Sequence, residues 1–277
     1  MSLGHPLVFV CFFTFLIHVT ESLAYCMRLA GVRTRKIAIA LAFVTSTLLV
    51  SRLSNMFQAP LLGSMVDKTI KLGAGPALTM LEYQFRFVIF SAFLGSLAGA
   101  FLGPTIVKFF SAAITHFQKN GSVPKVIIFA LKPRNIVKMV KSFRLPRLSM
   151  LSDISLKGIP KQFLIINVVV TSIYTIGVLC SLLAGAYVPE LRSTASQLSG
   201  IVNGLATIMF TIFVDPSGAR ITDGAVNGER PMSDVKSVVF FLQMGRIFGT
   251  LILSQILFKP FAIYIMWATR TIGHFFV

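Results

Sequence analysis

Residues 51–62 read Ser51-Arg52-Leu53-Ser54-Asn55-Met56-Phe57-Gln58-Ala59-Pro60-Leu61-Leu62. They end a long apolar segment, yet Arg52, Asn55 and Gln58 recur three residues apart and would follow one flank of a helix. A guanidinium group at membrane depth is costly, so such residues usually face a protein interior or a water-filled cavity. The stretch therefore predicts that Arg52 helps to line a polar cavity inside a bundle of membrane-spanning helices.

The composition supports a membrane protein. Hydrophobic residues make up 55% of the chain and charged residues 13%, whereas soluble domains carry about a quarter charged residues. The three cysteines lie in apolar segments without the spacing of a metal site or a disulfide framework. We therefore expect an all-α, polytopic membrane helix bundle that holds no metal and no cofactor.

Six segments are long enough to cross the hydrocarbon core, which takes about 20 apolar residues. The fifth is the shortest, and no internal repeat of the inverted type is recognisable in the sequence. The first is too long for the core of a signal peptide, so we do not expect it to be cleaved. Residues 1–277 are treated as a single integral membrane domain, with spans near residues 7–29, 37–57, 87–110, 163–187, 197–214 and 238–265.

The net charge of +17 comes from basic residues that lie between the hydrophobic segments. This placement indicates anionic membrane lipids as partners, and not nucleic acid. The first, third and fifth loops hold eighteen basic residues, against six on the other side. The positive-inside rule therefore predicts that these three loops are cytoplasmic and that both termini are outside.

The long third loop, residues 111–162, contains a basic amphipathic segment at residues 134–144. Ile136, Val140 and Phe143 would share one side of a helix, and Lys138, Lys141 and Arg144 the other. Such a pattern is typical of a helix that lies on the inner membrane surface. The alternative is a solvated basic loop that only fixes the topology.

Helical spacing gathers the polar residues of five spans into one stripe each. The third span differs, because Ser91, Gly95, Gly99 and Gly103 form a ridge of small residues that favours close helix packing. The stripes are Thr14, His18, Glu21, Ser22 and Tyr25; Arg52, Asn55 and Gln58; Asn167, Thr171, Tyr174 and Ser181; Ser196, Ser199, Asn203 and Thr207; and Gln243, Arg246, Thr250 and Ser254.

Hydrogen bonds between helices explain most of the serines and threonines, but they explain the ionisable residues poorly. Glu21, Arg52 and Arg246 lie within spans, where insertion costs about 3 kcal/mol each. A closed ion pair between Glu21 and one arginine would be structural. The second arginine leaves a surplus cation, which suits an anionic cargo. His18 is expected to be a hydrogen-bonded interior residue, with proton coupling through Glu21 as the lesser alternative.

The dipeptide Asp215-Pro216 is expected to end the fifth span, because proline interrupts helices. Asp215, Arg220 and Asp223 would then lie in a cytoplasmic loop that gates the inner mouth, unless simple turn chemistry accounts for them. The sequence contains no Walker loop, nucleophile elbow, zinc-ligand cluster or dinucleotide fingerprint. We therefore do not expect an enzyme, and a gradient, a membrane potential or downstream consumption would have to drive any transport.

Several segments form an ordered set along essentially the whole chain. They are the stretch from Ser51 to Leu62, Gly31-Val32-Arg33-Thr34, Lys157-Gly158-Ile159-Pro160-Lys161, Ile173-Tyr174-Thr175-Ile176-Gly177-Val178, Leu198-Ser199-Gly200-Ile201-Val202-Asn203-Gly204, Phe213-Val214-Asp215-Pro216, and Gly245-Arg246 with Gly249-Thr250-Leu251. Together they resemble the Amj family of alternate lipid II flippases of bacterial cell-wall synthesis.

This resemblance implies a protein of the bacterial plasma membrane that moves lipid II, the undecaprenyl-diphosphate-linked peptidoglycan precursor, to the outer leaflet. Arg52 and Arg246, beside Glu21, would contact the diphosphate, for which a guanidinium is well suited. The amides of Asn55, Gln58, Gln243, Asn167 and Asn203 would bond the sugars or the peptide. The polyprenyl tail would stay in lipid, so the cavity must open sideways.

Two other functions remain open from the sequence. One is a transporter of another anionic lipid-linked sugar or of a small organic anion. The other is a membrane scaffold subunit whose polar stripes only hold helices together. Six spans make a small bundle for so large a cargo, so a homodimer that encloses the path is a further expectation that the sequence does not test.

Overall fold

The computed structural model describes residues 5–73, 75–122, 125–126, 128, 132–141, 143–144, 146, 148–150 and 152–276, and these residues contain helices and no strand. The all-α prediction is thus confirmed. The helices are α1 (His5–Thr34), α2 (Ile37–Leu72), α3 (Pro76–Asn120), α5 (Pro133–Lys141), η1 (Leu148–Met150), α6 (Lys161–Tyr187), η2 (Pro189–Leu191), α7 (Arg192–Met209), η3 (Phe210–Val214), α8 (Asp215–Val226), α9 (Met232–Phe248), η4 (Gly249–Leu253) and α10 (Ser254–Phe276).

Among the described residues, six continuous helical stretches are long and apolar enough to cross a membrane, as predicted. Most are longer than the predicted spans. Helix α3 has 45 residues, which corresponds to about 67 Å at 1.5 Å per residue, roughly twice the hydrocarbon thickness. Helix α2 has 36 residues and continues through Pro60. Helix ends do not mark the membrane boundary, so the predicted span limits stay predictions.

The fifth stretch corrects the prediction that the helix ends at Asp215-Pro216. It continues without a break from Pro189 to Val226, so Asp215, Arg220 and Asp223 lie on helix α8 and not in a loop. The physical reason is the wider π-helical turn η3 just before them, in which the Asp215 N–H bonds Phe210 O. Pro216 then falls in the first turn of α8, where the amide hydrogen that proline lacks is not needed.

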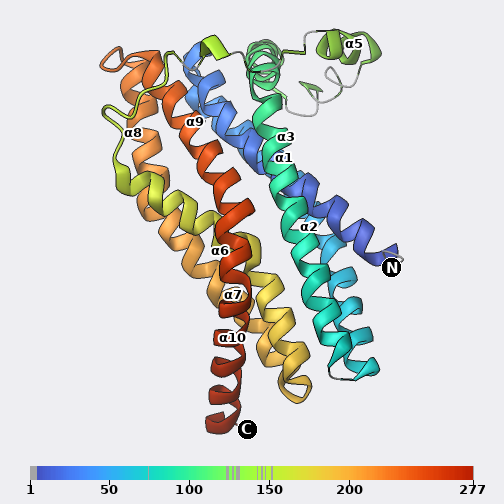
Figure 1. Cartoon of the computed structure of the whole chain (residues 1–277). Helices are drawn as coiled ribbons and strands as arrows, with labels where there is room; N and C mark the ends of the chain where they lie inside the picture. Colours follow the sequence, from blue (N-terminus) through green and yellow to red (C-terminus); the bar gives the residue numbers. More distant parts are fainter. Residues whose placement is uncertain are drawn as a thin grey trace.

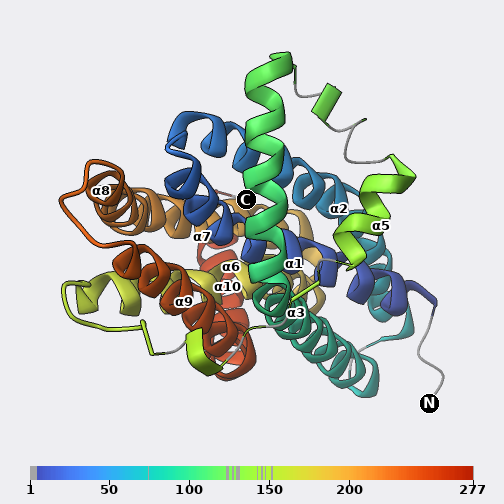
Figure 2. The same cartoon turned by 90° about the horizontal axis from the view of Figure 1, so that it is seen from above.

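The spans form two groups of three. Helix α1 packs against α2 and α3, and α6 packs against α7 and α10. Figure 1 shows the first group in blue and green beside the second group in yellow to red. Seen from above, α1 and α6 lie near the middle and α5 lies to one side (Figure 2).

The small-residue ridge of α3 is a close-packing surface, as predicted, and its partner is α1. Ser91 Oγ donates to Cys11 O at 2.5 Å, and a methyl group added at Gly99 would lie only 2.5 Å from Ser22 Cβ. The ridge therefore brings two backbones close together, which only very small side chains permit.

The loops alternate between the two ends of the bundle. The α1–α2 turn, helix α5 of the α3–α6 connection and the α8–α9 turn lie toward the top of Figure 1, which we call the basic end. The α2–α3 turn, the α6–α7 turn and the C-terminus lie toward the other end, which we call the opposite end. This arrangement brings together the three loops that the charge count predicts to be cytoplasmic.

The predicted amphipathic segment coincides in part with α5 at the basic end. Ile136 and Phe143 are exposed there, whereas the Val140 side chain lies outside the described part of the structure. Contact of this helix with the membrane surface stays a prediction.

Candidate functional site

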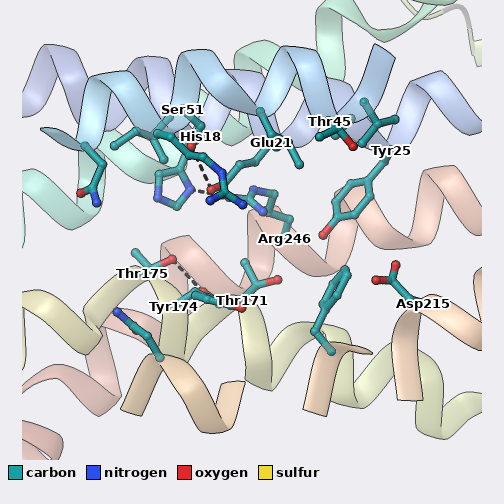
Figure 3. Close-up of a pocket in the computed structure, with 18 of the residues that line it drawn as sticks. His18, Glu21, Tyr25, Thr45, Ser51, Thr171, Tyr174, Thr175, Asp215 and Arg246 are labelled. Carbon is teal, nitrogen blue, oxygen red and sulfur yellow. Dashed lines mark hydrogen bonds and ion pairs between the residues drawn. The ribbon is translucent and has the colours of Figure 1, made fainter. Parts of the chain in front are cut away.

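A cavity of about 850 Å³ lies between the two groups of helices (Figure 3). Its walls come from α1 and α2 on one side and from α6, α7, α8 and α9 on the other. On α2 the lining residues run from Ile37 to Leu62. The stretch Ser51–Leu62 therefore forms part of a cavity wall, as its sequence predicts. Its ionisable lining residues are His18, Glu21, Tyr25, Arg28, Arg52, Tyr174, Asp215, Asp223 and Arg246.

Arg246 of α9 occupies the centre of this cavity (Figure 3). Its guanidinium forms an ion pair with Glu21 of α1 and donates to His18 Nδ1 at 3.0 Å. A guanidinium only donates, so Nδ1 accepts and carries no proton in this arrangement. Ser51 Oγ of α2 donates to the other Glu21 oxygen at 3.2 Å. His18 is thus an interior, hydrogen-bonded histidine, as predicted.

Helix α2 contributes the polar flank predicted from its sequence. Arg52 and Asn55 line the cavity and are exposed. Gln58 is buried, and its amide donates to Thr14 Oγ1 of α1 at 2.5 Å. No ion pair joins Arg52 to an acidic side chain anywhere in the described ranges of the chain. Arg52 is therefore a cation that faces the cavity without a carboxylate partner.

The part of the cavity nearest the basic end carries a second set of charges. Arg28 of α1 and Asp215 of α8 pair at 2.6 Å, and Asp223 also lines this part. The lining thus contains three arginines and three acidic residues in all, which revises the expected surplus of cations. The surplus is local, because Arg52 directly follows Ser51, which bonds the Glu21 carboxylate of the Glu21–Arg246 pair.

Two buried polar atoms at the cavity have no hydrogen-bond partner among the described residues: Asn203 Oδ1 and Arg246 Nε. Asn203 of α7 packs against Gly177 of α6, where an added methyl group would collide with the amide. Such unpaired buried groups are rare and cost about 1–3 kcal/mol. Tyr174, which also lines the cavity, is hydrogen-bonded to Thr207 of α7.

Three predicted site residues are not among the lining residues. Asn167 is fully buried, where it accepts from Tyr25 Oη at 3.3 Å and donates to Leu242 O at 3.2 Å. Gln243 donates to Cys26 Sγ at 3.0 Å. Both amides therefore join helices in this conformation. Arg220 is exposed on α8, outside the cavity lining.

Sequence reasoning missed Arg28 as a cavity residue, because the polar stripe identified in the first span stops at Tyr25. Arg28 lies inside α1, seven residues after Glu21, and thus on the face of the polar stripe that contains Glu21 and Tyr25. Extending that stripe by one turn would have identified it. Phe210 is also in the lining, and no polar pattern in the sequence marks it.

Comparison with known proteins places this arrangement in a family. The chain is 39% identical over 264 residues to a protein of Bacillus subtilis (strain 168) named "Lipid II flippase Amj", and the match covers 95% of this chain and 96% of that protein. No solved structure matches the chain. The model of the family described as "Amj: Alternate to MurJ" matches residues 13–269. The chain therefore belongs to the Amj family.

Proposed function

We propose that this protein is a lipid II flippase, which moves the undecaprenyl-diphosphate-linked peptidoglycan precursor from the inner to the outer leaflet of the bacterial plasma membrane. The observation that carries the proposal is the polar cavity between the two helix groups, with Arg52 and Arg246 in its lining. The relative named as a lipid II flippase, matched over nearly its whole length, supports the same cargo. A transporter, and not an enzyme, fits both observations.

The chemistry of the cavity suits the head group of this cargo. A diphosphate needs cations, and arginine binds phosphate oxygens through two parallel N–H groups. Arg52 has no acidic partner in the described part of the chain, and Arg246 has an unpaired Nε–H. Both can donate to an incoming phosphate without first giving up every existing bond. Asn55 and Asn203 lie in the same lining, where their amides would bond sugars or peptide.

The same geometry offers a place for the tail. Along the described helices, α2 packs against α1 and α3, while α7 packs against α6, η3 and α10. Helices α2 and α7 do not pack extensively against each other, although both line the cavity. Both helices expose apolar residues, among them Leu49 and Leu53 of α2 and Leu205 of α7. A polyprenyl chain would remain in lipid here while its head group enters the cavity.

Two other predicted properties complete the proposal. The basic end would face the cytoplasm, with both termini outside, and α5 would bind anionic lipids at the inner surface. A homodimer that encloses the path stays a prediction.

The membrane potential is sufficient as a driving force. Each negative charge that moves outward across an inside-negative membrane gains about 2.3 kcal/mol per 100 mV. Two to four charges on the cargo would give about 5 to 9 kcal/mol. Directional flipping that persists after an ionophore collapses the potential in vesicles would refute this part of the proposal.

The test of the function is a flippase assay with labelled lipid II in reconstituted vesicles. We expect the wild-type protein to transfer the lipid between leaflets, and Arg52→Ala and Arg246→Ala variants to insert and accumulate while transferring it much more slowly. A scaffold subunit would give no transfer with wild-type protein, and its arginine variants would fail to fold. Equal transfer of another lipid-linked anionic sugar would point to a broader cargo class.

A further inference from the structure

The two groups of three helices have opposite directions in the membrane. Helix α1 begins away from the basic end and runs toward it, whereas α6 begins at the basic end and runs away from it (Figure 1). In the first group α1 makes the most extensive contacts with the other two helices, and in the second group α6 does. The groups therefore have the same internal plan with inverted topology, which is common in transporters.

The third helix of each group packs on the first helix in the same register. In the second group this third helix is the continuous stretch of α9, η4 and α10. In the first group, Gly99 of α3 lies against Ser22 of α1. In the second group, Gly249 at the start of η4 lies against Ser172 of α6. Each member of the second contact stands 150 residues after its counterpart in the first. In both cases the serine hydroxyl also donates to a backbone carbonyl of the third helix, Ser96 O or Gly249 O.

A second contact repeats this spacing one turn earlier. An added methyl group at Gly95 would lie 3.0 Å from His18 Cβ, and one at Gly245 would lie 3.2 Å from Val168 Cγ2. The residues that follow these glycines, Ser96 and Arg246, are thus equivalent, and both reach His18 Nδ1, at 3.5 and 3.0 Å. Arg246 therefore lies where the two groups meet, which is where inverted-repeat carriers bind their substrates.

The cavity is closed by side chains at the opposite end but not at the basic end. A carrier with inverted repeats is expected to show this difference in any one conformation. Toward the opposite end the lining of α2 stops at Leu62. Beyond it, Met65 and Val66 are buried in an apolar cluster with residues of the second group, including Leu183 and Ala195. Past this cluster Asp67 of α2 forms an ion pair with Arg192, the first residue of α7.

The basic end also has one acidic and one basic residue at helix ends, but these two residues do not form an ion pair. Asp223, near the end of α8, is exposed and lines the cavity, and no ion pair joins it to a basic side chain in the described ranges. Lys36, directly before α2, is also exposed. Lys36 corresponds to Arg192, because each lies at the start of the second helix of its group. Asp223 corresponds to Asp67, because each lies near the end of that helical stretch.

We propose that the chain is an inverted duplication that opens its cavity to one membrane face at a time, with the Asp67–Arg192 ion pair as the gate of the closed end and Lys36 with Asp223 as the gate of the other. In the alternate state the Asp67–Arg192 contact opens, and α8 closes on the α1–α2 turn. This inference deepens the proposed function and rests on it for its cargo, but the gates can be tested without any cargo.

The test is chemical crosslinking in reconstituted vesicles without lipid II. The variant Lys36→Cys/Asp223→Cys is made in a chain whose native cysteines Cys11, Cys26 and Cys180 are replaced by alanine, and a short bifunctional thiol reagent is added. We expect a crosslink, because the alternate state brings the two positions together. Adding Asp67→Asn should raise its rate roughly two- to fivefold, since a partly exposed ion pair is worth up to about that factor.

Two controls isolate the gate. Glu190→Gln removes an exposed acid at the same end as Asp67 and should leave the crosslinking rate unchanged. The exchange Asp67→Arg/Arg192→Asp should return the rate to that of the parent, which a merely destabilised protein would not do. Absence of the crosslink, or a rate that does not respond to Asp67→Asn, would overturn the proposal. Failure of wild-type vesicles to flip lipid II would instead overturn the proposed function and leave this result standing.

Discussion

Replacing Arg52 by glutamine separates cargo binding from folding. Arg52 is exposed to the cavity and has no acidic partner in the described part of the chain, so the free energy of unfolding should change by less than about 0.5 kcal/mol. A hydrogen bond to a charged group contributes about 1.5–3 kcal/mol. Loss of one such bond to the diphosphate should therefore weaken binding roughly 10- to 150-fold, at 1.4 kcal/mol per factor of ten.

The assay compares purified Arg52→Gln protein with wild type for lipid II affinity and for thermal unfolding in the same detergent. Arg270→Gln is the matched control, because Arg270 is an exposed arginine of α10 outside the cavity. We expect weak binding for Arg52→Gln alone, and the same melting temperature for all three proteins. Unchanged affinity would refute the assignment of Arg52 to the cargo, and equal loss in Arg270→Gln would show that only net charge matters.

Three further predictions follow from single contacts. Glu21→Gln should lower the free energy of unfolding by about 1–3 kcal/mol, because Arg246 loses its charged partner while Glu21 is one-third exposed; a denaturant titration that shows no loss would contradict the pair. Gly99→Leu should destabilise by at least about 1–3 kcal/mol by forcing α3 away from α1, and an unchanged melting temperature would contradict the close packing. The hydrogen bond from Lys236 holds the pKa of Asp153 below its ordinary value, so this pair stabilises the fold above the unfolded-state pKa and loses its effect as pH falls through the folded-state pKa. Lys236→Met should raise the Asp153 pKa toward the ordinary value, measured by carboxyl carbon NMR, and an unchanged pKa would exclude the contact.

Much of the architecture could be predicted from the sequence, because the membrane imposes simple rules. Apolar length predicts six spans, and helical spacing predicts which face of each span is polar. The ridge that contains Gly95 and Gly99 packs closely, as expected, although the sequence did not identify α1 as its partner. The continuation of the fifth helix past Pro216 was not predictable in this way, because it depends on a π-helical turn that no propensity signals.

The site was predicted less completely, for a physical reason. A polar stripe shows which residues avoid lipid but not whether they meet a cavity or a neighbouring helix. The Asn55 amide lines the cavity, whereas the amides of Asn167 and Gln243, which also belong to polar stripes, bond other helices. The inverted duplication was not recognisable from the sequence. Only a few glycine and serine positions repeat at a spacing of 150 residues, and the apolar residues between them differ.

A structure of the protein with bound lipid II, determined by electron cryo-microscopy, tests the central claim most directly. The account predicts diphosphate density in the cavity between α2 and α9, within hydrogen-bonding distance of Arg52 and Arg246, with the polyprenyl tail leaving between α2 and α7. Head-group density elsewhere on the protein, with the cavity closed around the Glu21–Arg246 pair, would contradict it.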